Sequence, residues 1–143
     1  MKKFFKWVIV TLIGLQALVI IAGIVIFRMP LPDHGIDVTD LPLTDFVEVI
    51  RDERGIPHIY GTNVDDILFA QGYVHAQDRF WQLEFWSHLS TGRLASLIGE
   101  PGVGADLLFR TFGFHKVALE EYENLEPEFK NDIINYTAGI NAY

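Results

Sequence analysis

The sequence predicts an α+β chain that is mostly helical, with an apolar first helix, then one β-hairpin, then several helices. Three observations predict this. Residues 7–27 carry no charge, residues 47–60 alternate in character around a turn, and apolar residues after Asn63 recur every three or four positions. These patterns are typical of a membrane helix, a strand pair and packed helices, respectively.

The apolar run 7–27 is long enough to cross a membrane, because as an α-helix it spans ~31 Å. Lysines precede it and Arg28 follows it. The positive-inside rule therefore predicts a cytoplasmic amino terminus and an extracytoplasmic remainder, in the periplasm or at the cell surface. We expect residues 1–28 to be an uncleaved signal anchor.

A cleaved signal peptide is the alternative for this run. Its apolar core is usually about 7–15 residues and ends in a small-x-small site. No Ala-x-Ala follows the run, although cleavage near Ala22-Gly23 stays open. A core helix of a soluble protein would show a polar face, which this run lacks.

Residues 29–45 are rich in proline and aspartate and lack a helical period. We expect a linker that lifts the next domain off the membrane, with room for a short strand around residues 35–41. Residues 46–143 are enough for one domain at most.

The hairpin is predicted from alternation and turn residues. Val47, Val49 and Arg51 share one face of the first strand, and residues 52–55 end in a glycine that tolerates positive φ. Pro57 suits the start of the return strand, where its missing N–H does no harm.

A long helix follows, capped by Asn63 and with acids in its first turn. Two apolar stripes predict that it is buried on most sides and needs more protein around it than this chain supplies. Residues 90–92 predict its end or a kink. Gly72 is expected where the helix closely approaches another element.

Four polar residues interrupt the stripes: Gln77, Asp78, Arg79 and Glu84. We favour a buried network in which they satisfy one another and nearby backbone. A catalytic or substrate-binding role is the alternative.

Three shorter helical segments complete the prediction. A turn spans residues 93–99, a loop spans 102–105, and a helix capped by Asp106 runs to about residue 122. Pro127 suits the first turn of a last helix. The sequence stops at Tyr143 inside that helical pattern, so we expect an incomplete domain.

Charge and composition exclude several functions. The net charge is −8, and beyond residue 28 seven basic residues face nineteen acidic ones, a net charge of −12. This balance argues against nucleic-acid binding. The chain has no cysteine, which rules out disulfides and thiolate metal sites.

The histidines do not predict a metal site, because their spacing matches no ligand pair. The sequence also lacks a phosphate-binding glycine loop and a Gly-x-Ser-x-Gly elbow. Residues 135–137 match a glycosylation sequon only weakly. We expect surface or packed histidines at all five positions, His34, His58, His75, His88 and His115.

Three sequence blocks resemble the amino-terminal part of the penicillin acylase family of N-terminal nucleophile (Ntn) hydrolases. They are Arg51-Asp-x-x-Gly-Ile-Pro-His-Ile-Tyr60, Gly72-Tyr-Val-x-Ala-Gln-Asp-Arg79 and Gly92-Arg-Leu-Ala-x-Leu-Ile-Gly99, in that order. The resemblance covers residues 46–143. It implies the first-chain part of an αββα Ntn-hydrolase fold, and hydrolysis of non-peptide amides such as β-lactam side chains or N-acyl homoserine lactones.

The resemblance also implies where the chemistry lies. Family members cleave themselves to release an amino-terminal serine whose α-amino group, with an unperturbed pKa of about 7.7–8.0, can act as base. The serines here, Ser87, Ser90 and Ser96, do not follow a glycine, and residues 61–63 fit helix capping better than a processing site. We therefore expect no catalytic, cofactor-binding or metal-binding residue here, and a nucleophile beyond residue 143.

The expected partner is the second, nucleophile-bearing chain or a downstream segment of the same precursor. Calcium is expected in the complete enzyme, with ligands mostly in that second chain. Alone, this chain is expected to be inactive. The alternatives are a non-catalytic, membrane-tethered interaction protein and a truncated gene product.

Overall fold

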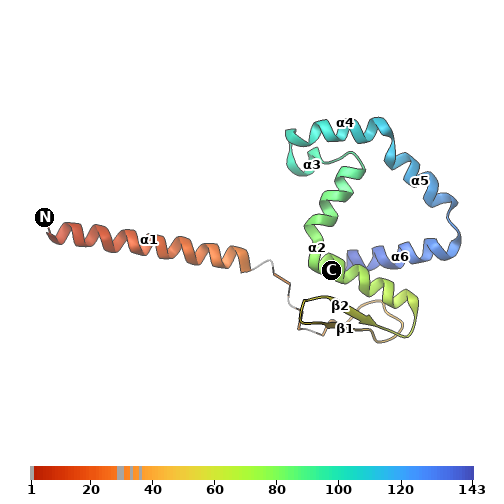
Figure 1. Cartoon of the computed structure of the whole chain (residues 1–143), viewed down its shortest axis with the longest axis horizontal. Helices are drawn as coiled ribbons and strands as arrows, with labels where there is room; N and C mark the ends of the chain where they lie inside the picture. The colour runs from red at the N-terminus through yellow and green to blue at the C-terminus, as the bar shows by residue number, and fades with distance from the viewer. Residues whose placement is uncertain (1, 29–30, 33, 36) are drawn as a thin grey trace. The chain divides into compact units, whose positions relative to one another are not determined.

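The computed structural model describes residues 2–28, 31–32, 34–35 and 37–143 (Figure 1). The chain divides into two compact units, residues 1–37 and residues 38–143. Each unit is described by itself.

The first unit contains helix α1, Lys2–Arg28. Its segment Lys6–Arg28 is long and apolar enough to cross a membrane, and a signal sequence would have the same properties. The Thr11 hydroxyl donates to the carbonyl oxygens of Trp7 and Val8 within the helix, at 3.1 and 2.9 Å. The helix predicted over residues 7–27 is confirmed, and the Thr11 hydroxyl is satisfied within it.

The second unit begins with an irregular segment. The short strand predicted around residues 35–41 is wrong for the residues described there, 35 and 37–41, none of which is in a strand. Residue 36 lies outside the described residues. Asp40 has a positive φ of 65°, which turns the chain in a way that strand geometry does not allow.

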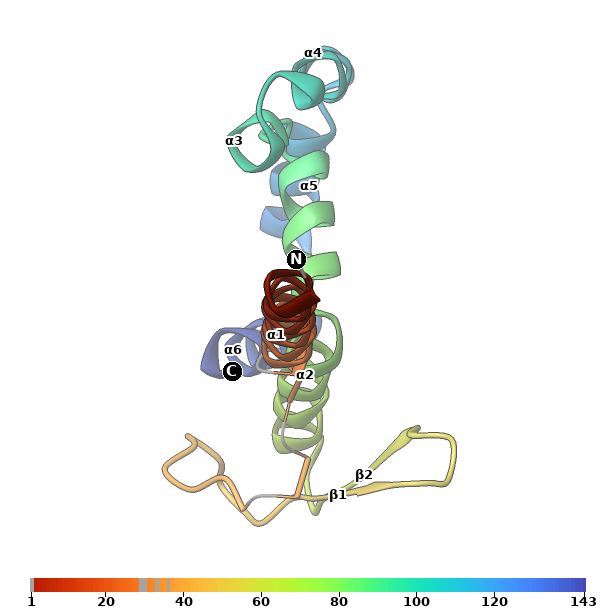
Figure 2. The same ribbon diagram turned by 90° about the vertical axis from the view of Figure 1, so that its left-hand side faces the viewer.

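The predicted hairpin is confirmed. Strands β1, Glu48–Arg51, and β2, Pro57–Tyr60, pair antiparallel, with Arg51 opposite Pro57. Their turn is closed by a 2.9 Å hydrogen bond from the Gly55 N–H to the Asp52 carbonyl, and Gly55 has the expected positive φ of 77°. Figure 2 shows the hairpin at the amino-terminal end of the long helix.

That helix is α2, Val64–Ser90. The Asn63 side chain caps it by accepting a 2.8 Å hydrogen bond from the Asp66 N–H, as predicted. The helix is not straight, because Arg79 has a φ of −140° and a ψ of 27°. All of its buried residues lie between positions 66 and 76. The prediction that it is buried on most sides therefore holds in this unit only for its first half.

The last helix, α6, runs from Pro127 to Ala142 and packs across the first half of α2. Gly72 is buried at this crossing, and a Cβ there would overlap the carbonyl oxygen of Tyr136. The predicted close approach at Gly72 and the predicted Pro127 start are both confirmed.

The intervening helices correct two predictions. They are α3 (Ala95–Ile98), the short 3-10 helix η1 (Glu100–Gly102), α4 (Val103–Phe112) and α5 (Phe114–Asn124). Residues 103–105 belong to α4, so the predicted loop at 102–105 is wrong. The predicted helix to residue 122 is interrupted, because Gly113 has a φ of 71° and ends α4 with a left-handed cap.

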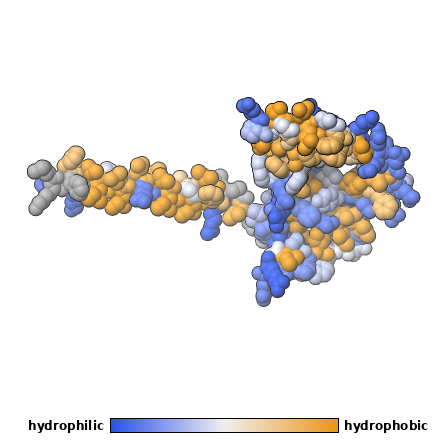
Figure 3. Space-filling model, turned by 45° about the horizontal axis from the view of Figure 1, so that its top comes forward, coloured by the Kyte–Doolittle hydropathy of each residue, from blue (hydrophilic) through white to orange (hydrophobic). Residues whose placement is uncertain are grey.

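The core of the second unit is small. Within the described part of the chain, the buried hydrophobic residues are Phe69, Ala70, Val74, Ala76 and Leu94. Many larger apolar side chains are exposed, and Figure 3 shows apolar residues gathered over the helical part of the surface. A unit with this little buried apolar area gains little hydrophobic stabilisation of its own.

Candidate functional site

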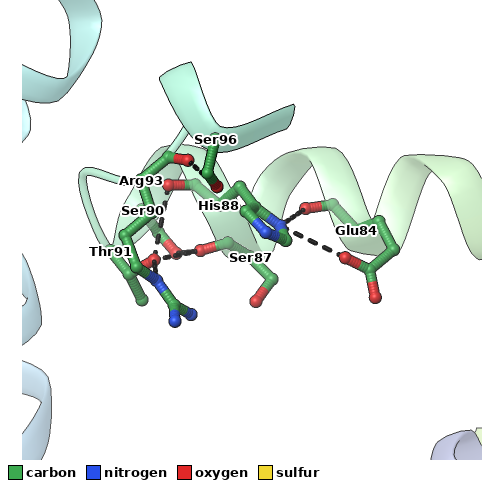
Figure 4. A network of polar contacts seen from close by, with 7 residues as sticks. All are labelled: Glu84, Ser87, His88, Ser90, Thr91, Arg93 and Ser96. Carbon is green, nitrogen blue, oxygen red and sulfur yellow. Dashed lines mark hydrogen bonds and ion pairs between the residues drawn. The ribbon is translucent and has the colours of Figure 1, made fainter. Parts of the chain in front are cut away.

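The residue types of a hydrolytic site come together at the carboxyl end of α2, where a histidine, a glutamate and three serines lie within a few residues (Figure 4). His88 Nδ1 lies 3.2 Å from Glu84 Oε2 and 2.9 Å from the Glu84 carbonyl oxygen. A histidine held by a carboxylate is one half of the arrangement that activates a serine. The serines decide whether the other half is present.

Two of the three serine hydroxyls are bound to backbone carbonyls. Ser90 Oγ donates to the Ser87 carbonyl at 3.2 Å, and Ser96 Oγ donates to the Arg93 carbonyl at 2.7 Å. Within the described residues, no serine hydroxyl forms a hydrogen bond with a histidine ring. General-base activation requires that bond, so the cluster does not form a Ser-His-Glu triad.

The cluster instead terminates the helix. Thr91 Oγ1 accepts from Arg93 Nε at 3.0 Å and donates to the Ser87 carbonyl at 2.7 Å. Carbonyls in the last turn of a helix lack partners in the helix itself, and nearby hydroxyls supply them. This gives residues 87–96 a structural role.

The four polar residues of α2 do not form one buried network, which corrects that prediction. Asp78 and Gln77 contact the hairpin residue Arg51, whereas Glu84 contacts His88 one turn of helix further on. Arg79 reaches only Gln82 within the described residues, at 3.5 Å.

The Arg51 guanidinium joins the hairpin to α2. Its two terminal nitrogens each lie 2.9 Å from one carboxylate oxygen of Asp78. The same nitrogens also donate to the Gly55 carbonyl at 3.2 Å and to Gln77 Oε1 at 3.0 Å. Bidentate arginine–carboxylate pairs are among the stronger and more directional polar contacts. Arg51 therefore connects the first of the three sequence blocks, residues 51–60, to the second, residues 72–79.

A second junction surrounds Asp66, which is only 4% exposed. Its carboxylate accepts from the backbone N–H of Thr44 at 3.0 Å, from that of Asp45 at 2.9 Å, and from the Asn63 side chain. Because the Thr44 N–H and then the Asn63 amide stabilise the charged form, the pKa of Asp66 lies below the ordinary 3.8. Residues 44–45 are thus attached to the start of α2.

A third junction involves Asp106, which was predicted to cap its own helix. Its carboxylate instead accepts from the backbone N–H groups of Leu94 and Ala95, at 2.5 and 2.9 Å, and so caps the separate helix α3. Arg110 Nε, also in α4, donates to the Gly92 carbonyl at 2.6 Å. The third sequence block, residues 92–99, is therefore held in place by contacts with α4. Sequence spacing contained no signal for this contact.

The histidines remain dispersed. His58 Nε2 lies 3.7 Å from Asp52 Oδ2, and His75 Nδ1 lies 2.8 Å from the Tyr136 hydroxyl. In the part of the chain that the structure describes, no group of three or more His, Asp or Glu side chains is arranged to hold a metal ion. These residues therefore do not fit a calcium site.

What the second unit does present is apolar surface. Trp81 is 63% exposed and Leu107 is 69% exposed. Soluble domains rarely expose so many large apolar side chains unless another surface covers them. We call the following at least half-exposed residues of α2 and α4 the open apolar set: Phe80, Trp81, Trp86, Leu107, Leu108 and Phe112.

Comparisons with known proteins give this arrangement a context. A family model described as "Penicillin amidase" matches residues 46–143. The chain is similar to the penicillin acylase 2 proenzyme of Pseudomonas sp. strain SE83, with 41% identity over 97 residues, covering 68% of this chain and 12% of that protein. It is also similar to the acyl-homoserine lactone acylase QuiP of Pseudomonas putida, with 37% identity over 101 residues, covering 71% of this chain and 12% of that protein.

The fold has a solved counterpart as well. A thermostable penicillin G acylase from Alcaligenes faecalis matches with a TM-score of 0.62 and 26% sequence identity, covering 68% of this chain and 52% of that chain. The expected fold, a hairpin and several helices similar to part of such an enzyme, is thereby confirmed. The present chain corresponds to a small part of the length of the curated relatives that it matches.

Proposed function

Because this chain belongs to the penicillin amidase family, we propose that it is the amino-terminal, first-chain part of an amidohydrolase that cleaves non-peptide carbon–nitrogen bonds. The family match carries this proposal. The relatives named above are a penicillin acylase and an acyl-homoserine lactone acylase. Side-chain amides of β-lactams and N-acyl homoserine lactones are therefore the substrate classes that we propose.

We propose that the reaction uses a nucleophile outside these 143 residues. Two serines of the chain support this, because Ser90 and Ser96 donate to backbone carbonyls rather than to a base. An amino-terminal serine released by self-cleavage would use its own α-amino group to accept the hydroxyl proton. We also propose that the complete enzyme binds calcium, with ligands mostly in the second chain.

The chain's own contribution is a structural support with an apolar surface. Polar contacts hold its three sequence blocks in place. Arg51 of the first block binds Asp78 of the second, and Asp106 and Arg110 of α4 bind backbone groups of the third. The open apolar set is left to be covered. We propose that the nucleophile-bearing segment or chain of the same precursor covers it, since burying apolar side chains is the main favourable term in such association.

We further propose that α1 is an uncleaved signal anchor with its amino terminus in the cytoplasm. Its apolar segment and flanking charges support this arrangement. Amino-terminal sequencing of the protein from isolated membranes tests it. A mature terminus at Met1 supports the anchor, whereas a new terminus near Gly23 means that a signal peptide was removed.

Activity is tested with a chromogenic phenylacetyl amide and, separately, with an N-acyl homoserine lactone. The purified chain alone is expected to show no turnover. The same chain produced together with the downstream coding region is expected to hydrolyse at least one of the two substrates. Turnover by the chain alone would refute the proposal that the nucleophile lies outside these 143 residues.

A non-catalytic, membrane-tethered interaction protein is the second candidate, because the open apolar set would suit a protein partner equally well. The nucleotide sequence after the codon for Tyr143 separates the two. A continuing reading frame, or a neighbouring frame that opens with Ser-Asn after a glycine, supports the hydrolase. A stop codon with no such frame supports the interaction protein.

A further inference from the structure

The kink in α2 has no cause in its local sequence. Sharp helix kinks occur at proline, at Gly/Ser pairs, at π-bulges or where a contact disturbs the helix. Residues 75–83 read His-Ala-Gln-Asp-Arg-Phe-Trp-Gln-Leu and contain no proline, glycine or serine. Arg79 nevertheless leaves helical geometry in the middle of this run. Residues 64–90 contain no π-helical turn either. A contact from another part of the fold is therefore the cause that is left among these.

The bidentate pair between Arg51 and Asp78 lies immediately before the kink. It fixes the last residue of the straight first half of α2 to the end of β1, and the Arg51 side chain is only 18% exposed. The Gly55 carbonyl holds the same guanidinium from the hairpin turn at 3.2 Å. A planar guanidinium with acceptors on both sides has little freedom to reorient.

The kink also marks a change in packing. Before it, α2 is buried against α6. After it, Phe80 is 51% exposed and Trp81 is 63% exposed. Figure 1 shows the two halves of α2 running in different directions, with the second half leading to α3 and α4. The angle at Arg79 thus decides where the open apolar set is presented.

We propose that Arg51 and Asp78 form a positioning clamp that sets the kink at Arg79, and so directs the second half of α2 towards the rest of the enzyme. The proposed function is needed only to identify the rest of the enzyme as the partner of the second half of α2. The geometry of the clamp does not depend on it. Arg51 is a positioning residue and takes no part in the chemistry.

The clamp is tested by measuring the distance across the kink. The chain has no cysteine, so Val64→Cys and Ser87→Cys introduce two spin labels at exposed positions on either side of Arg79. In a straight helix these positions would lie ~35 Å apart. Double electron–electron resonance on the full chain in detergent is expected to give a shorter, narrow distribution.

Arg51→Met is expected to move this distribution towards ~35 Å or to broaden it, and Arg51→Lys to do so partly, because a lysine keeps the charge but loses the bidentate fork. Two variants serve as controls. Arg54→Met makes the same charge change in the adjoining hairpin turn, where the described residues show a hydrogen bond from the Arg54 backbone N–H to Asp52 and no partner for its guanidinium. Tyr136→Phe removes the hydrogen bond to His75, one turn before the kink. Both are expected to keep the wild-type distance.

The proposal is overturned if the unsubstituted chain already gives ~35 Å, if Arg51→Met stays folded with an unchanged distribution, or if Arg54→Met gives the same shift. If Arg51→Met loses its helical circular dichroism, Arg51→Lys decides. A folded Arg51→Lys with the wild-type distribution overturns the clamp, and so does unfolding of Arg51→Lys, because the pair would then hold the fold together rather than direct a helix. Since activity is not measured, the proposed function can fail or stand independently.

Discussion

Gly72 of α2 and Gly139 of α6 lie at one helix crossing, where each glycine stands against the backbone of the opposite helix. A Cβ on Gly72 would overlap the Tyr136 carbonyl oxygen, and a Cβ on Gly139 would overlap the Phe69 carbonyl oxygen. Backbone atoms cannot move aside as the end of a side chain can. The contact of α6 with α2, the helix that carries most of the small core, therefore depends on both glycines.

We predict that Gly72→Ala and Gly139→Ala each destabilise the second unit. Overpacking costs about 1–3 kcal/mol or more against backbone, which exceeds the gain of about 1 kcal/mol in helix propensity. Thermal unfolding followed by circular dichroism measures the difference. Gly104→Ala in α4 is the matched control, because a Cβ there meets nothing within 4 Å. A stabilised Gly72→Ala variant would show that the helices are further apart than described.

The hydrogen bonds that attach residues 44–45 to Asp66 are predicted to be lost at acid pH. The Thr44 N–H, followed by the Asn63 side chain, holds the pKa of Asp66 below 3.8. A depressed carboxyl pKa contributes stability above the unfolded-state value, about 3.9, and that stability is lost as the pH falls through the folded-state value. The amide proton signals of Thr44 and Asp45 should therefore keep their positions down to about pH 4 and shift below it.

Asp66→Asn should abolish most of this acid transition at Thr44 and Asp45, because an asparagine does not titrate and keeps only one acceptor oxygen. Asp65→Asn is the control. It removes a charge from the same first turn, where the Asp65 carboxylate accepts from the Asn131 side chain at 2.8 Å. Equal acid transitions in Asp66→Asn and in the unsubstituted chain would contradict the assignment.

Asp106 is predicted to stabilise α3 from a distance of twelve positions in sequence. Asp106→Ala leaves the N–H groups of Leu94 and Ala95 without their acceptor, and the loss of a helix cap costs about 0.5–2 kcal/mol. Hydrogen exchange of residues 94–98 should accelerate. Asp106→Asn should show a smaller effect, since one oxygen remains. Unchanged exchange in Asp106→Ala would mean that α3 is held by packing alone.

The open apolar set predicts how the second unit behaves without its partner. A polypeptide of residues 38–143 should bind a hydrophobic dye such as ANS strongly and should associate, because large apolar side chains remain in contact with water. Production together with the downstream region should suppress both properties. A monomeric polypeptide with a sharp melting transition and no dye binding would show that this unit needs no cover.

The elements that sequence patterns predicted correctly follow local rules. The hairpin follows from alternation and a Gly55 that accepts positive φ, the start of α2 from the capping side chain of Asn63, and the start of α6 from Pro127. Gly113 carried a similar local signal, since a glycine often ends a helix in the left-handed conformation. Its helical neighbours on both sides masked that signal.

The sequence by itself determined the apolar first helix, the hairpin, the capping residues and the family resemblance, since each depends on neighbours within a few positions or on motifs read directly. Only the tertiary structure decided that Arg51 reaches Asp78, that Asp106 caps another helix, and that α2 bends at Arg79. The contacts of Arg51 and Asp106 join residues eleven or more positions apart. Their geometry depends on how the chain folds back on itself, which no local pattern encodes.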